Sequence, residues 1–103
     1  MRKSKKKARA IRIRIYGDEP LDVPSPWRVI DEKLICNFEF PNFDTAKKFV
    51  DEVSILAEIQ NHHPDIKFGW GYVSLELFSH DEKKITSRDI SLAQRISEIE
   101  RRV

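Results

Sequence analysis

The stretch Glu58-Ile59-Gln60-Asn61-His62-His63-Pro64 opens the part of the chain around which the rest is organised. All three histidines of the protein, His62, His63 and His80, fall between residues 58 and 89. Histidine has an ordinary pKa of about 6.5, so it can gain or lose a proton near neutral pH. A single histidine could simply be a polar side chain on the surface. Three of them in one half of a small domain suggest proton-transfer chemistry.

The spacing around the paired histidines predicts where a helix ends. Glu58 precedes His62 by four residues, so the two would be neighbours on one helix face. Pro64 disfavours the helical conformation at His63, which predicts a helix end there. We therefore expect Glu58 to orient the imidazole of His62 at the end of a helix. The alternative is that Glu58 is an ordinary exposed glutamate.

Two helices are predicted from apolar periodicity and start signals. Apolar residues recur at intervals of three and four from about residue 45 to 61, as in an amphipathic helix with Asp44 as its expected N-cap. The last helix is expected to begin at Thr86-Ser87-Arg88-Asp89, a variant of the capping box. Asp89 therefore has a structural role at a helix start, and we expect it also to bond His80.

The remaining segments read mainly as strands. Residues 27–30 and 34–40 are predicted as two strands joined by a turn around residues 31–33, and residues 72–78 as a third. Residues 64–71 fit either a short strand or a loop. Ile11 to Ile15 alternate apolar and basic residues, which predicts an extra N-terminal strand. The order predicts an α+β fold, with helices packed on one face of an antiparallel sheet.

Composition limits the classes of protein to consider. With 103 residues, 40% of them apolar and 35% charged, the chain is predicted to be one globular domain. It has no apolar run of the roughly 18 residues that span a membrane, and no apolar stretch follows the basic N-terminus as in a secretory signal. The single cysteine, Cys36, sits on an alternating run and is expected in the core. A reducing, cytoplasmic location fits this cysteine usage.

Charge is distributed unevenly along the chain. Residues 1–14 hold eight of the 19 basic residues and no acidic one, which leaves 11 basic and all 17 acidic residues for the rest. A basic arm of this kind could bind nucleic acid phosphates. We prefer an arm that lies against its own acidic body, because residues 1–15 hold no aromatic side chain that could stack on bases. Residues 1–9 are predicted to be a flexible tail and residues 10–103 a single domain.

The spaced residues carry a resemblance to a known family. The order Glu58-x3-His62-His63-Pro64-x5-Trp70-x9-His80-x8-Asp89 resembles the signature of the pterin-4a-carbinolamine dehydratases. Residues 38–43 resemble the family's aromatic strand-to-helix junction, and Trp27 stands where a tryptophan precedes it. The resemblance covers about residues 27–100. Many members carry tryptophan and asparagine where this chain has Ile66 and Phe68, and relatives usually begin with a helix that residues 1–26 do not predict.

The resemblance implies both a fold and a function. It implies a four-stranded antiparallel sheet backed by helices, assembled as a homodimer or homotetramer. It also implies a hydro-lyase that dehydrates 4a-hydroxytetrahydropterin to quinonoid dihydropterin in tetrahydropterin recycling, with the pterin as substrate and no metal or cofactor. Proton transfer would fall to His62 and His80, assisted by Glu58. The pterin would be held by the remaining candidates: His63, Pro64, Trp70, Asp89 and Trp27. The alternative for the two tryptophans is that they fill the core.

Two alternatives come from other classes of function. Three histidines and a carboxylate could bind zinc; the adjacent His62 and His63 point in different directions, however, and no His-x3-His pair exists. The resemblance also implies a rival, since some members act as dimerisation partners or coactivators of transcription factors. Such a non-catalytic module could contact nucleic acid through the basic arm. A pure scaffold has no physical need for the histidines together with Glu58 and Asp89.

Overall fold

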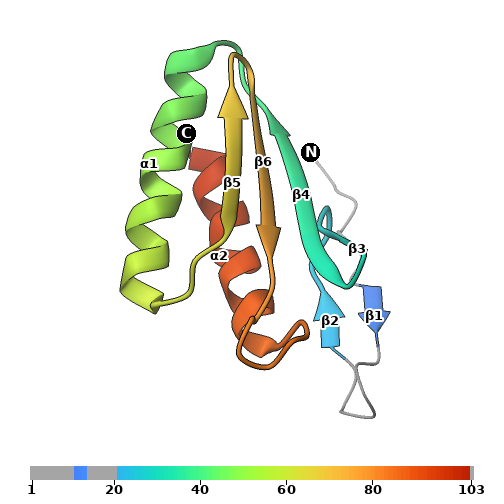
Figure 1. The fold of residues 1–103 in the computed structure, drawn as a ribbon. Coiled ribbons are helices and arrows are strands. Elements are labelled where there is room, and N and C mark those ends of the chain that lie inside the picture. The colour runs from blue at the N-terminus through green and yellow to red at the C-terminus, as the bar shows by residue number, and fades with distance from the viewer. Residues whose placement is uncertain (1–10, 14–20, 103) are drawn as a thin grey trace.

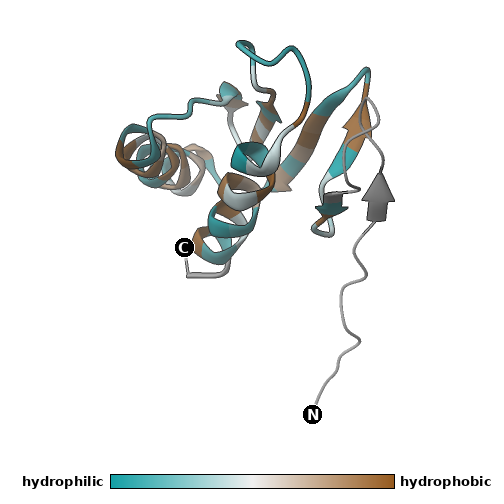
Figure 2. Cartoon of the chain, turned by 90° about the horizontal axis from the view of Figure 1, so that it is seen from below, coloured by the Kyte–Doolittle hydropathy of each residue, from teal (hydrophilic) through white to brown (hydrophobic). Residues whose placement is uncertain are grey.

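The computed structural model describes residues 11–13 and 21–102, so the tail predicted at residues 1–9 lies outside the described residues. The elements in chain order are β1 (Ile11–Ile13), β2 (Leu21–Val23), β3 (Arg28–Ile30), β4 (Lys33–Glu39), α1 (Phe43–Gln60), β5 (Asp65–Gly69), β6 (Tyr72–Leu77) and α2 (Ser87–Arg102). Four of the strands form an antiparallel sheet in the order β3-β4-β6-β5. Both helices lie on one face of this sheet (Figures 1 and 2), which confirms the predicted α+β class.

The extra N-terminal strand is present, but it stays out of the main sheet. β1 pairs antiparallel with β2 in a separate two-stranded sheet, with Ile11 opposite Val23. Residues 14 and 15 of the predicted strand lie outside the described residues. Val23 is fully buried, so this small sheet is joined to the core of the domain.

The main sheet follows the predicted alternation. On β4 the buried positions are Leu34, Cys36 and Phe38, and each lies opposite a buried residue of β6. Side chains two residues apart point to the same face of a strand, so one face meets the helices. The β3–β4 turn places Asp31 and Glu32 at φ values of 52° and 65°, the left-handed pair that two-residue hairpins use to match strand twist.

The N-cap of helix α1 lies two residues before the predicted one. Asn42, not Asp44, is the N-cap, because the Oδ1 atom of Asn42 accepts a hydrogen bond from the backbone N–H of Thr45 at 2.9 Å. Asp44 lies inside the first turn, where its carboxylate is 3.4 Å from the Nζ atom of Lys48.

The end of α1 decides where the paired histidines go. Asn61 adopts the left-handed conformation at φ 52°, and its N–H donates to the carbonyl of Glu58 at 3.3 Å. The N–H of His62 donates to the carbonyl of Ala57 at 3.1 Å. These two bonds form a Schellman motif, which ends a helix and turns the chain back across its last turn.

Within residues 11–13 and 21–102, neither helix is long and apolar enough to cross a membrane.

Candidate active site

His62 is a buried histidine held by a buried carboxylate. The Schellman turn carries it toward the start of α2, where its Nε2 atom lies 2.6 Å from Oδ1 of Asp89. The side chain of His62 is 10% exposed, and that of Asp89 is fully buried. A buried charge or polar group is costly unless it is hydrogen-bonded. The imidazole gives the buried carboxylate a donor, and the carboxylate gives the imidazole an acceptor.

The second oxygen of Asp89 is also satisfied. Its Oδ2 atom accepts the backbone N–H of Thr86 and the hydroxyl of Ser79, both at 2.8 Å. The Oγ1 atom of Thr86 in turn accepts the N–H of Arg88 at 3.2 Å. The predicted capping box at the start of α2 is therefore confirmed. The expected bond from Asp89 to His80 is wrong, because the carboxylate that caps α2 holds His62 instead.

Glu58 pairs with the neighbouring histidine. Its Oε2 atom lies 2.7 Å from Nε2 of His63, and the two side chains are 78% and 52% exposed. The expected pairing of Glu58 with His62 is wrong because the four-residue spacing holds only while a helix continues. Here the left-handed Asn61 reverses the chain first, so His62 turns inward and His63 stays beside Glu58.

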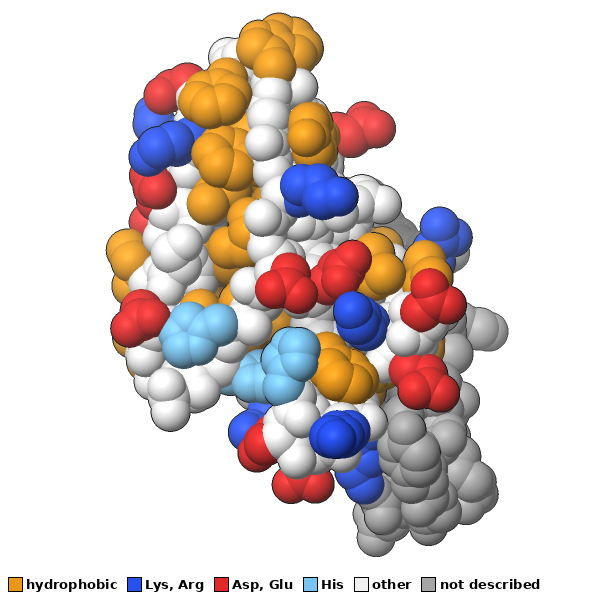
Figure 3. Space-filling view, in the orientation of Figure 1, with side chains coloured by type: hydrophobic (Ala, Val, Ile, Leu, Met, Phe, Trp, Pro, Cys, Tyr) orange, Lys and Arg blue, Asp and Glu red, His pale blue; other side chains and the backbone are white. Residues whose placement is uncertain are grey.

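His80 lies on the exposed surface just beyond β6. Its ring packs edge-to-face on Phe78, with the ring centres 5.2 Å apart. The residue before it is Ser79, which binds the same carboxylate that holds His62. In Figure 3 the histidine side chains gather at one end of this face, where α1 and β6 end in Figure 1. The structure therefore brings all three imidazoles to the same end of the domain.

An ion pair ties the His80 turn to the start of α2. The Nη2 atom of Arg88 lies 2.7 Å from Oδ1 of Asp81, the residue after His80. The hydrogen bond from the Arg88 guanidinium holds the pKa of Asp81 below its ordinary value. Both side chains are well exposed, so the pair is screened by solvent and contributes little to stability.

Pro64 lies with the histidines, whereas Trp70 does not. Pro64 follows His63 directly and precedes β5. Trp70 is 72% exposed in the β5–β6 turn, at the far end of a strand of five residues, or roughly 17 Å at 3.3 Å each. Trp27 is 1% exposed, and its indole N–H donates to the hydroxyl of Ser97 at 3.0 Å. Trp70 thus lies at the other end of β5 from His63, and Trp27 takes the core position that is the alternative for it. Contact of either tryptophan with a pterin stays a prediction.

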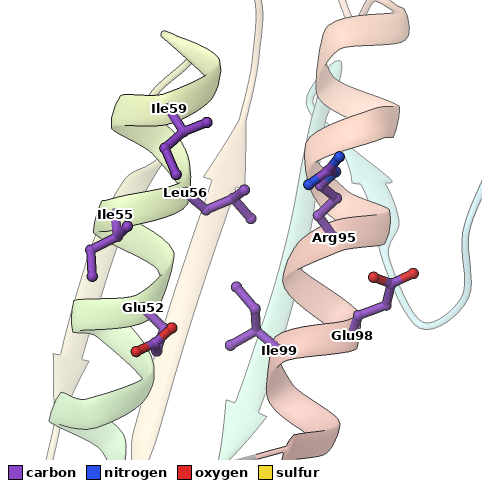
Figure 4. Close-up of a pocket in the computed structure, with 7 residues that line it drawn as sticks. All are labelled: Glu52, Ile55, Leu56, Ile59, Arg95, Glu98 and Ile99. Carbon is purple, nitrogen blue, oxygen red and sulfur yellow. The ribbon is translucent and has the colours of Figure 1, made fainter.

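Two surface hollows lie away from the histidines. One, of about 240 Å³, runs between α1 and α2 and is shown in Figure 4 with its lining residues Glu52, Ile55, Leu56, Ile59, Arg95, Glu98 and Ile99. The other, of about 340 Å³, lies beside β3 and β4. Neither is lined by a histidine. Among the residues that the structure describes, no three His, Cys, Asp or Glu side chains are grouped to hold a metal ion.

Comparison with known proteins identifies the family. Residues 14–99 match the family model described as pterin 4 alpha carbinolamine dehydratase. The chain belongs to this family. A relative from Rubrobacter xylanophilus, named "Putative pterin-4-alpha-carbinolamine dehydratase", is 43% identical over 71% of this chain and 69% of its own length. One from Metallosphaera sedula with the same name is 34% identical over 84% and 90%.

Two solved structures share the fold. A Brucella melitensis protein titled as a transcriptional coactivator/pterin dehydratase superposes with a TM-score of 0.70 and 30% identity, covering 73% of this chain and 82% of the other. A pterin dehydratase-like protein, titled as a RuBisCO assembly factor of the alpha-carboxysome, gives 0.63 and 25%, covering 72% and 88%. The titles of these two proteins therefore name coactivator and assembly roles beside pterin dehydratase.

The two positions of β5 at which the resemblance predicts other residues face the core. Ile66 and Phe68 stand on β5 opposite the buried Leu75 and Val73 of β6. Both are partly buried and pack against the core. Ile66 and Phe68 therefore place apolar side chains on the helix-facing side of β5.

Ser79 is the site residue that sequence reasoning missed. It is fully buried and binds Asp89. The signal was present in the alternation, because Ser79 continues the inward series Val73, Leu75 and Leu77 with a hydroxyl. A polar side chain on a buried face needs a partner, and that partner is the carboxylate that holds His62.

Proposed function

We propose that this protein dehydrates 4a-hydroxytetrahydropterin to quinonoid dihydropterin, as a hydro-lyase of tetrahydropterin recycling. The observation that carries the proposal is the contact chain from His62 through Asp89 and Ser79 to the turn that bears His80. Family membership supports the substrate class. The two imidazoles are the proton-transfer groups, and His63, paired with Glu58, is a pterin-binding group.

The reaction needs one acid and one base. The hydroxyl on the saturated ring carbon leaves as water once its oxygen is protonated, and the adjacent ring nitrogen loses its proton as the new double bond forms. One proton is thus taken up and one released, so no net proton is consumed. A positioned acid or base typically contributes about 10² to 10⁴ in rate.

The contacts of His62 define which of its atoms can take part. Its Nε2 atom faces Oδ1 of Asp89, so a substrate would have to meet the other ring nitrogen, Nδ1. A carboxylate at Nε2 fixes the tautomer and the ring angle, as in other acid–base histidines oriented by a buried acid. His80 is exposed and free to approach the pterin from the side of β6.

The test is turnover of 4a-hydroxytetrahydropterin, followed by absorbance of the quinonoid product. His62→Gln keeps an N–H donor for Asp89 and His80→Gln changes an exposed residue, so both variants should fold. We expect kcat to fall about 10²- to 10⁴-fold in each, as for loss of one acid or base. Gln94→Ala, an exposed polar change on α2, is the matched control and should retain turnover. Unchanged turnover in both histidine variants would refute the proposal.

A binding role without catalysis is the second candidate, favoured by the titles of the two similar structures. It predicts no turnover above the uncatalysed rate in the wild-type protein. The assay above therefore separates the two functions before any partner is known. A homodimer or homotetramer is compatible with either function, and light scattering of the purified chain measures it.

A further inference from the structure

Ser79 occupies an unusual position for a polar residue. It is fully buried, one residue before His80 and two after the end of β6. Its backbone anchors the turn that carries His80: its N–H donates to the carbonyl of Lys84 at 3.2 Å, and its own carbonyl accepts the N–H of Lys83 at 2.7 Å. The place of His80 on the surface therefore depends on where Ser79 sits.

The hydroxyl of Ser79 has a defined direction. A carboxylate oxygen only accepts, so the hydroxyl donates to Oδ2 of Asp89 at 2.8 Å. Toward Thr86 the same oxygen can then only accept, and the hydroxyl of Thr86 donates to it at 2.7 Å. The result is a directed chain, from Thr86 to Ser79 to Asp89, that ends on the carboxylate.

This chain limits how the carboxylate can turn. With Oδ2 held by the hydroxyl of Ser79 and the N–H of Thr86, Oδ1 is left facing Nε2 of His62 at 2.6 Å. Without the Ser79 hydroxyl, Oδ2 keeps a single donor and the carboxylate is held less firmly against rotation about its last side-chain bond. The ring of His62 would then lose its fixed angle.

We propose that Ser79 is a positioning residue that fixes where the side chains of His62 and His80 lie relative to each other. Its hydroxyl fixes His62 through Asp89, and its backbone fixes the turn of His80. Ser79 is linked to His62 through Asp89 and is the residue before His80. One buried residue therefore determines the relative placement of the two imidazoles. The inference rests on the proposed dehydratase function for its effect on turnover, but its effect on the His62 ring is independent of that function.

The experiment compares Ser79→Ala with Ser79→Thr, which restores the hydroxyl. Ser74→Ala is the matched control, a serine on the opposite face of β6. We expect kcat of Ser79→Ala to fall about 10- to 100-fold with KM within about twofold, because small misplacements of catalytic groups have effects of this order. Ser79→Thr should recover most of the loss, and Ser74→Ala should match wild type. Unfolding curves give the folded fraction used to normalise kcat.

A spectroscopic measurement separates positioning from simple stability. In ¹⁵N-labelled wild-type protein, the Nε2–H proton of His62 should give a slowly exchanging downfield signal, which should broaden or vanish in Ser79→Ala and persist in the other two variants. If this holds while the wild type has no turnover, the positioning stands and the dehydratase proposal fails. Folded Ser79→Ala with unchanged kcat and an unchanged signal overturns the inference. If Ser79→Ala does not fold, Ser79→Cys, a much weaker donor of similar size, takes its place with the same expected results.

Discussion

Replacing Asp89 tests whether the buried carboxylate joins the site to the fold. Asp89→Ala would leave three donors without their acceptor: the Nε2–H of His62, the hydroxyl of Ser79 and the N–H of Thr86. An unsatisfied buried donor costs about 1–3 kcal/mol, and loss of a helix cap about 1 kcal/mol. Water can bond to His62 and Thr86 and so offset part of this cost. We therefore expect the free energy of unfolding to fall by about 3–5 kcal/mol, the usual range for breaking a buried pair.

The loss is large compared with the stability of a small domain. Domains of this size have free energies of unfolding of about 5–15 kcal/mol. With a denaturant slope of about 1–3 kcal/mol per molar urea, the unfolding midpoint of Asp89→Ala should fall by roughly 1–5 M. The assay is urea unfolding followed by circular dichroism and by the fluorescence of the buried Trp27. Asp89→Asn, which keeps one acceptor oxygen, should fall between the alanine variant and wild type.

The control is another carboxylate from the same region. Asp81 pairs with Arg88 at 2.7 Å but is exposed, so Asp81→Ala should leave the midpoint nearly unchanged. If Asp89→Ala lost no more stability than Asp81→Ala, the reasoning that the buried network joins His62 to α2 would be refuted.

Three further predictions follow from single contacts. Burial, with a smaller effect from Glu100, raises the pKa of the Cys36 thiol to about 11, so the folded protein at pH 8 should react slowly with Ellman's reagent and the urea-unfolded chain quickly. The stability that comes from keeping this thiol neutral is fully present below its pKa in the unfolded chain, near 9.0, and is lost as the pH rises toward 11. Unfolding midpoints at pH 8 and pH 11 would show this loss. Asn42→Ala should cost about 1 kcal/mol in the free energy of unfolding, because Asn42 caps α1; no loss in urea titration would contradict that cap. Trp70→Ala should keep turnover within about twofold, and a tenfold loss would show that the exposed Trp70 contributes to the site after all.

The fold could be predicted from the sequence because its signals are periodic. Alternation on β4 and β6 and the three–four spacing on α1 each concern many residues and point to one buried face. The start of α1 was misplaced because Asn42 and Asp44 are both good N-caps two residues apart. Only the contact with Thr45 distinguishes them.

The sequence offers candidate residues for the site, but it does not determine how they pair. Glu58 and His62 match the helical spacing, yet the left-handed conformation of Asn61 interrupts the helix between them. Asparagine adopts that conformation readily without requiring it, so the sequence gives no decisive sign of the turn. For this reason Glu58 pairs with His63 and not with the expected His62.

Trp70 shows a second limit of sequence reasoning. Its match to the family signature concerns order along the chain, and order does not determine which end of a strand faces the site. Trp70 lies at the opposite end of β5 from His63, and Trp27 is enclosed by the core, with its ring centre 6.2 Å from that of Phe38.

The central claim is that one pterin is held at the end of the domain where His62, His63 and His80 lie. The most direct measurement is a crystal structure of the protein with a stable dihydropterin, supported by titration of the imidazole NMR signals. We predict the bicyclic ring in contact with His63 and His80, one of its polar atoms facing Nδ1 of His62, and shifts of all three imidazoles with a single dissociation constant. A pterin bound in the hollow between α1 and α2, or elsewhere, with the imidazole signals unmoved, would contradict the account.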